Sequence, residues 1–149
     1  MPAGLFYLPI VLCWTLLALR YRSLSLPTAV NPMIEAGGLC GESKAASLVL
    51  LGPEGRRRLA PFATVATAGR AHDLGNALAA AKTAGLTFPM IVKPDIGCRG
   101  TGVRIVADAA ALGRYLEAFP SGARVMLQRL EPGPGEAGIF WLRRPGEKT

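Results

Sequence analysis

The sequence predicts an α+β domain that is preceded by a hydrophobic N-terminal helix. Its 149 residues are 50% hydrophobic and 18% charged, which is enough chain for one domain with a core and too apolar for a disordered tail. Short apolar runs that end at Pro or Gly alternate with segments whose apolar residues recur at helical spacing, and this alternation predicts both strands and helices. We divide the chain into a hydrophobic helix over 1–22, a Gly- and Pro-rich connecting loop over 23–41 and the domain proper over 42–149.

The first element is the run LFYLPIVLCWTLLAL over 5–19, which carries no charge and is followed at once by Arg20 and Arg22. At about 1.5 Å per residue it spans about 22 Å, less than the roughly 30 Å hydrocarbon core of a bilayer. No basic segment precedes it and no small-residue cleavage site follows it, so a secretory signal is disfavoured. We expect a helix that begins near Pro9 and is buried in the core or against a partner. The alternative is a membrane anchor whose Arg-rich side faces the cytoplasm.

The next segments alternate between helices, loops and a strand. Ser43 precedes an apolar run that ends at Gly52 and Pro53, the pattern of a short capped helix. Residues 55–58 form a charged loop, and 62–68 predict a short strand. Residues 73–84 place Leu and Ala on one face and are followed by glycine, which predicts an amphipathic helix.

Residues 90–106 predict a strand, a glycine-rich loop and a second strand. MIVK over 90–93 is a buried-strand run closed by Pro94, GCRGTG over 97–102 is the loop, and 103–106 is the second strand.

Beyond this hairpin the alternation continues. Asp108 precedes apolar residues at helical spacing, so it caps a helix that ends at a Pro-Ser-Gly sequence. A strand over 124–128, a turn over 132–135 and a further strand over 137–142 complete the prediction.

The charge and cysteine patterns exclude several classes of protein. A net charge of +7 favours an anionic partner, but most of the 17 basic residues are scattered arginines with no stripe of interleaved aromatics, so nucleic acid is an unlikely partner. Cys13, Cys40 and Cys98 lie far apart and never as CxxC, which disfavours a disulfide framework or a zinc site and makes a reducing cytoplasm the default.

The loop over 97–102 has the composition of a phosphate-binding loop. Glycine lets backbone N–H groups approach an anion closely and turn inward, and Lys93 on the preceding strand adds a positive charge. The P-loop pattern is missing, and the Rossmann pattern fails because a strand rather than a helix follows the glycines. These residues alone leave two interpretations open: a phosphate site and a structural hairpin turn.

The sequence FPMIVKPDIGCRGTGV over 88–103 is followed about thirty residues later by LQRLEPGPGE over 127–136. Together they resemble the nucleotide-binding portion of the ATP-grasp superfamily, especially the carboxylate-amine ligases similar to D-alanine:D-alanine ligase. The resemblance covers about residues 42–149. It implies an incomplete ATP-grasp-like subdomain of antiparallel strands with packed helices.

The resemblance implies contacts with the phosphates of ATP. In that family a strand lysine contacts phosphate, which falls on Lys93, and an earlier basic residue near a helix start does so too, which falls on Lys44. A solvent-facing role for Lys44 stays open, and so does the role of Arg99 within the loop. The loop that closes over the triphosphate contributes Gly97, Gly100, Thr101 and Gly102.

The resemblance also implies contacts with the nucleoside. The connection between the two subdomains holds adenine, and its residues here are Gln128, Arg129 and Leu130. A glutamate beyond it takes ribose hydroxyls, for which Glu136 is the better match and Glu131 the competitor. Alternatively, Gln128 is an exposed strand residue and both glutamates are solvated turn charges.

The chain departs from the family where metal and catalytic residues are expected. The complete family domain binds Mg²⁺ through acidic and Asn side chains beyond the linker, whereas only Glu147 follows Glu136 here. The metal ligands are therefore absent, and no catalytic residue can be named. We expect a truncated part of an ATP-dependent ligase that activates a carboxylate as acyl phosphate and joins it to an amine. The alternative is a small non-catalytic protein, membrane-associated through residues 5–19, whose glycine hairpin is structural.

Overall fold

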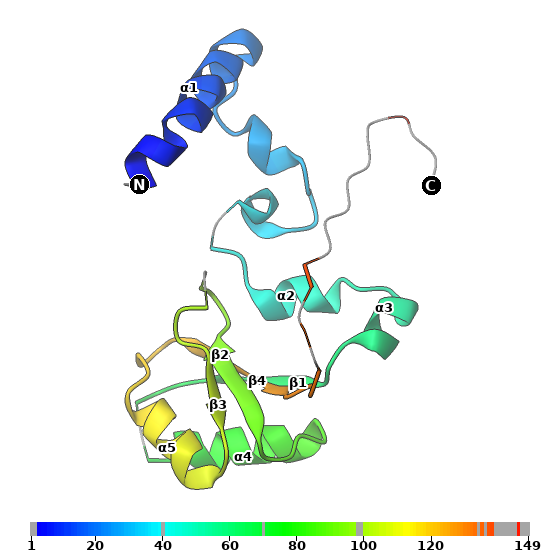
Figure 1. The fold of residues 1–149 in the computed structure, drawn as a ribbon, viewed down its shortest axis with the longest axis vertical. Helices are drawn as coiled ribbons and strands as arrows, with labels where there is room; N and C mark the ends of the chain where they lie inside the picture. The colour runs from blue at the N-terminus through cyan, green and yellow to red at the C-terminus, as the bar shows by residue number, and fades with distance from the viewer. Residues whose placement is uncertain are drawn as a thin grey trace.

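The computed structural model describes residues 3–39, 41–69, 71–97, 100–133, 135, 137–138 and 146. In this part of the chain, a four-stranded antiparallel sheet has the order β1-β4-β2-β3. Helices α4 and α5 lie on one side of the sheet and α2 lies on the other (Figure 1). The predicted α+β class is confirmed at this level. The strands are β1 (Phe62–Ala66), β2 (Met90–Pro94), β3 (Arg104–Val106) and β4 (Arg124–Arg129).

Strand register divides the side chains between the two faces. Val92 lies opposite Leu127, and both are buried on the face that carries the core. Because side chains alternate along a strand, Lys93 and Gln128 belong to the opposite face. Lys93 pairs with Met126 in the register, so Gln128 is its diagonal neighbour on β4.

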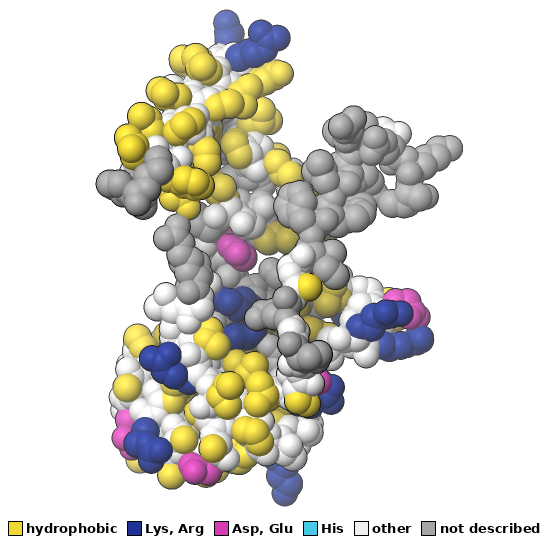
Figure 2. Space-filling model, in the orientation of Figure 1, with side chains coloured by type: hydrophobic (Ala, Val, Ile, Leu, Met, Phe, Trp, Pro, Cys, Tyr) yellow, Lys and Arg dark blue, Asp and Glu magenta, His cyan; other side chains and the backbone are white. Residues whose placement is uncertain are grey.

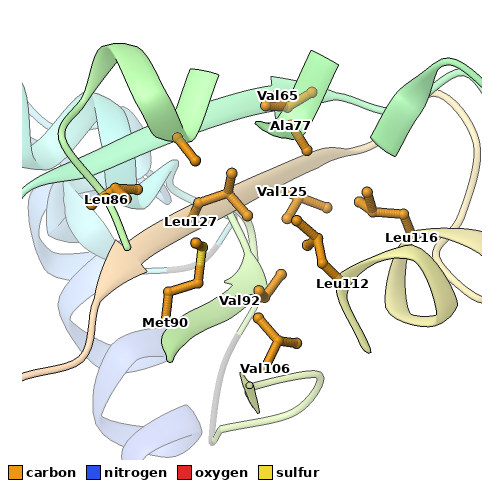
Figure 3. Close-up of a cluster of buried hydrophobic side chains, with 11 residues drawn as sticks. Val65, Ala77, Leu86, Met90, Val92, Val106, Leu112, Leu116, Val125 and Leu127 are labelled. Atoms are coloured by element: carbon orange, nitrogen blue, oxygen red, sulfur yellow. The ribbon is translucent and has the colours of Figure 1, made fainter. Parts of the chain in front are cut away.

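The hydrophobic core lies between the sheet and two helices, α4 (Asp73–Thr83) and α5 (Ala109–Glu117). The close-up shows strand side chains meeting Ala77 of α4 and Leu112 and Leu116 of α5 (Figure 3). Both helices were predicted from the spacing of their apolar residues, and burial of these residues against the sheet stabilises the helices. The labelled core residues are Val65, Ala77, Leu86, Met90, Val92, Val106, Leu112, Leu116, Val125 and Leu127.

Two predicted helix caps are present. Ser43 precedes α2 (Lys44–Val49) and its side chain accepts a hydrogen bond from Ala46 N at 3.0 Å. Asp108 precedes α5 and accepts from Ala111 N at 2.7 Å. Each cap satisfies an amide that has no partner inside the helix, which fixes where the helix begins.

The predicted charged loop over 55–58 is wrong, because these residues belong to helix α3 (Pro53–Arg58). Pro53 at the first helical position has its φ angle already set for a helix, and Arg57 pairs with Glu54 at 2.8 Å one turn away. The predicted strand over 62–68 ends earlier, at Ala66, because Thr67 pairs with the turn residues Gly122 and Ala123.

The predicted start of the N-terminal helix is also wrong, and so is its burial in the core, whereas burial against a partner stays a prediction. Helix α1 (Ala3–Tyr21) begins six residues before Pro9 and runs through it. A proline inside a helix removes one backbone hydrogen bond, and the neighbouring turns hold the helix together. Of the residues from Gly4 to Tyr21, 6% are buried, so α1 is not a core helix in the described part of the chain.

The predicted connecting loop over 23–41 contains two short 3-10 turns, η1 (Leu26–Ala29) and η2 (Glu35–Gly38). Residues 132, 133 and 135 belong to neither a helix nor a strand, and residue 134 lies outside the described residues, so the turn over 132–135 stays a prediction. The predicted strand over 137–142 lies outside the described residues from 139 onward, and Glu136 and Arg99 lie outside them as well.

Candidate anion-binding site

A small pocket of about 80 Å³ lies where the end of β2 meets the glycine loop and the start of α2. Three separate segments supply its walls, so the pocket exists only in the folded chain. Figure 2 shows basic side chains gathered near the end of β2 that faces α2. The pocket is lined by Lys44, Lys93, Pro94, Gly97, Gly100, Thr101 and Val103.

Lys93 projects from β2 toward its diagonal neighbour on β4. Its Nζ donates a hydrogen bond to Gln128 Oε1 at 2.7 Å, and Gln128 Nε2 donates to the Ala60 carbonyl at 3.3 Å. Burial lowers the pKa of Lys93 below its ordinary value of 10.5, and the nearby charge of Lys44 lowers it further. The fold therefore holds this ammonium group where its charge is disfavoured unless an anion is close.

Lys44 reaches the pocket from the first residue of α2. Its Nζ donates to the carbonyl oxygens of Asp95 at 3.1 Å and Gly97 at 2.8 Å, and its backbone N donates to the same Asp95 oxygen at 3.1 Å. Lys44 is thus hydrogen bonded to the backbone on either side of Ile96, which places its charge at the start of the glycine loop.

Asp95 is the residue that sequence reasoning missed. Its side chain is 2% exposed and accepts hydrogen bonds from Ser43 Oγ at 2.7 Å and Ala45 N at 2.9 Å, with Arg124 Nη1 at 4.0 Å. A buried carboxylate is stable when such donors surround it. Asp95 therefore fixes the start of α2, and with it Lys44, beside the end of β2.

The pocket carries positive charge without a matching acid. Among the described residues, neither Lys44 nor Lys93 forms an ion pair with a carboxylate. Two ammonium groups that face one small pocket repel each other, and an anion between them would remove that cost.

The glycine loop adds backbone donors. The Gly100 carbonyl accepts from Val103 N at 3.1 Å, and the Gly102 carbonyl accepts from the Tyr115 hydroxyl at 2.8 Å. Within the described part of the chain, the amides of 100–102 make no hydrogen bond. The loop is thus held by its carbonyl groups, which leaves its amides available to an anion.

A second pocket of about 600 Å³ lies on the same face of the sheet, at the end of β4. The hydrogen bond between Lys93 and Gln128 joins the two pockets. Ala60 and Ile91 supply apolar walls, while Arg129 Nε donates to Glu131 Oε1 at 2.6 Å. The residues predicted to hold adenine therefore lie beside those predicted to hold phosphate. The lining residues are Ala60, Ile91, Gln128, Arg129, Leu130, Glu131, Gly133 and Gly135.

Three residues that were predicted to contact the nucleotide are not placed as free lining residues of the two pockets. Gly102 does not line the first pocket. It lies close against Pro94, because a Cβ at Gly102 would be 2.8 Å from Pro94 Cγ. The carboxylate of Glu131 is engaged by Arg129. Glu136 lies outside the described residues, so its role stays a prediction.

Magnesium ligands are not assembled in the described residues. No group of three or more His, Cys, Asp or Glu side chains there is placed to hold a metal ion. The lining of the first pocket contains two lysines and no carboxylate, so it suits an anion rather than a bare metal ion.

Comparisons with known proteins yield no relative: no protein-family model, no curated protein and no solved structure matches the chain.

Proposed function

We propose that the chain is the nucleotide-binding part of an ATP-grasp ligase and that it binds ATP along the open face of its sheet. The observation that carries the proposal is the convergence of Lys44, Lys93 and the loop residues Gly97, Gly100 and Thr101 on one pocket. These residues come from α2, β2 and the glycine loop, and each was expected to contact phosphate on sequence grounds.

Phosphate suits the smaller pocket for electrostatic reasons. A polyphosphate placed there would accept charge-assisted hydrogen bonds from two ammonium groups, which are about twice as strong as bonds between neutral groups. It would also restore the charged form of Lys93, whose pKa is lowered by burial and by Lys44. The amides of Gly100 and Thr101 would supply further donors.

The larger pocket suits a purine. Its volume of about 600 Å³ falls within the roughly 300–1,000 Å³ typical of small-molecule sites. Ile91 and Ala60 offer apolar contact. Arg129 ends β4 and its backbone N donates to the Pro61 carbonyl at 3.0 Å, so the backbone at Leu130, just after the strand, is the part that can read the edge of a base. Gln128 lies between the phosphate and base ends and is oriented by Lys93.

The proposal assigns binding and orientation to these residues. In the ligase reaction ATP would phosphorylate a carboxylate, and an amine would then displace the phosphate to form an amide. Lys44 and Lys93 would hold the transferring phosphate and balance its charge. Magnesium and the reacting carboxylate would need groups beyond those described, so the proposed function of the described residues is nucleotide binding.

Equilibrium dialysis with labelled ATP tests the proposal. We expect Lys93→Ala to weaken ATP binding at least about tenfold, since a hydrogen bond to a charged group contributes roughly 1.5–3 kcal/mol. Lys82→Ala is the matched control, because Lys82 is an exposed lysine in the last turn of α4 and lines neither pocket. Equal affinities of the two variants would refute the proposed site.

A further inference from the structure

Helix α1 exposes apolar side chains around its whole circumference. Leu5, Phe6, Leu8, Ile10, Val11 and Leu12 are each more than half exposed. At 100° per residue these positions point in every direction around the helix axis. Figure 2 shows hydrophobic side chains over most of α1 and basic side chains at one end. A helix that is apolar on all sides is typically buried in a protein core or in a membrane. In the described part of the chain only 6% of the residues from Gly4 to Tyr21 are buried, so the core does not cover α1.

The apolar part of α1 is long enough for the lower limit of a membrane span. Its 19 residues, less Arg20 and Tyr21 at the end, leave 17 residues over 3–19, which extend about 25 Å at 1.5 Å per residue and fall at the lower end of the roughly 17–25 residues of spanning helices. The window from Gly4 to Tyr21 has a mean hydropathy of 1.5. The start of the helix at Ala3 adds two residues, or about 3 Å, to the run over 5–19.

The side-chain hydroxyl of Thr15 is satisfied inside α1, where it donates to the Val11 carbonyl at 2.8 Å. An internal bond of this kind is required in hydrocarbon, where no water is present to replace it.

The charged end of α1 complements a lipid surface. Arg20 and Arg22 are exposed, and within the described residues neither pairs with a carboxylate. The Arg20 guanidinium lies 5.8 Å from the centre of the Tyr21 ring. Arginine and tyrosine at a helix end are typical of the boundary between hydrocarbon and headgroups, and arginine attracts anionic lipid.

We propose that α1 is a membrane-spanning anchor that occupies a lipid bilayer, with Arg20, Tyr21 and Arg22 at the headgroups. The sheet then lies on the side of the membrane that these arginines face, which is the cytoplasmic side by the positive-inside tendency. The inference does not depend on nucleotide binding, because α1 lines neither pocket of the candidate site.

Flotation of the full chain tests the anchor. The chain is synthesised in a cell-free system with vesicles of equal parts phosphatidylcholine and phosphatidylglycerol, then washed with alkaline carbonate and floated on a density gradient. We expect the wild-type chain to float. Leu12→Lys with Leu16→Lys should reduce the floating fraction at least about tenfold, because each lysine at the centre of a spanning helix is strongly disfavoured.

The matched control is Val30→Lys with Met33→Lys. It adds the same charges at residues that are 72% and 74% exposed outside α1, so it should float like the wild type. A wild-type chain that remains at the bottom of the gradient would overturn the proposal. If that chain is an oligomer, α1 is assigned to contact between copies instead of to the bilayer. Flotation lost equally in both double variants, or wild-type release by carbonate, would overturn it as well.

Discussion

Lys93 carries a charge that its surroundings in the fold disfavour. In the folded chain its ammonium group is half-buried, close to a second cation, and bonded to the neutral amide of Gln128. Burial and the Lys44 charge both disfavour its protonated form, so the pKa is lowered from 10.5. Below the lowered pKa the charged lysine therefore destabilises the fold, and we propose that the same charge attracts an anion.

Replacing the charge should stabilise the protein and weaken binding. We expect Lys93→Met to raise the free energy of unfolding at neutral pH by up to about 1 kcal/mol, after allowance for solvent screening of a half-exposed group. The difference should shrink as pH rises from the lowered pKa toward 10.5, because the unfolded chain then binds more protons than the folded one. Urea unfolding at several pH values measures it, and a variant less stable than wild type at neutral pH would contradict this account.

We expect the same shift to make the proposed ATP binding sensitive to alkali. Bound phosphate favours the charged lysine, so affinity should be constant below the lowered pKa of Lys93 and fall as pH rises through it. The fall should begin at lower pH than an ordinary lysine would give. Lys93→Arg keeps its charge at every pH in this range and should flatten the profile. Dialysis between about pH 8 and 11 makes the comparison, and identical profiles would rule out Lys93 as the titrating group.

Gly102 is a residue whose small size is required. Its φ angle is +76°, and a Cβ would lie 2.8 Å from Pro94 Cγ and 3.0 Å from Pro94 Cδ. Gly100 has a φ angle of +71° but meets no atom within 4 Å. We expect Gly100→Ala to cost about 1–2 kcal/mol from its backbone angle. Gly102→Ala should cost at least about 1 kcal/mol more from the clash, and equal midpoints in urea would show that the loop absorbs it.

At the scale of elements, a buried carboxylate positions α2. Asp95 accepts hydrogen bonds from Ser43 and Ala45 and thereby places Lys44 beside the loop. We expect Asp95→Ala to lower the free energy of unfolding by roughly 2–4 kcal/mol, because the buried donors lose their partner. We also expect weaker ATP binding, because Lys44 is no longer held.

The control for Asp95 is another aspartate that caps a helix. Asp108→Ala removes the exposed cap of α5, far from both pockets, and should cost about 1 kcal/mol without changing ATP affinity. Affinity unchanged in Asp95→Ala would show that α2 does not position Lys44 for binding.

Local signals explain which elements were predicted. Ser43 and Asp108 cap α2 and α5 because a short polar side chain before an apolar helical run has few better partners than the helix amides. Helix α3 was missed because charge suggested a loop, while Pro53 favours a helix start. Helix α1 was placed too late because Pro9 resembles a start signal, although a helix supported by many other bonds can continue through a proline.

At the scale of the molecule, the sheet order brings the candidate site together. β4 lies between β1 and β2, which places Gln128 next to Lys93 although they are distant in sequence. The predicted site residues come from motifs, which preserve residue type and spacing but carry no direct information on pairing between distant segments. The link between Asp95 and α2 joins residues about fifty positions apart, so no local pattern could have predicted it.

We propose that Lys44 and Lys93 face one anion pocket that takes the phosphates of ATP. Acylation of lysines in the full chain by an amine-reactive ester, mapped by mass spectrometry with and without ATP, tests it directly. The account predicts that ATP slows the modification of Lys44 and Lys93 several-fold and leaves the exposed Lys82 unchanged. Modification of all three lysines at rates unaffected by saturating ATP would contradict it.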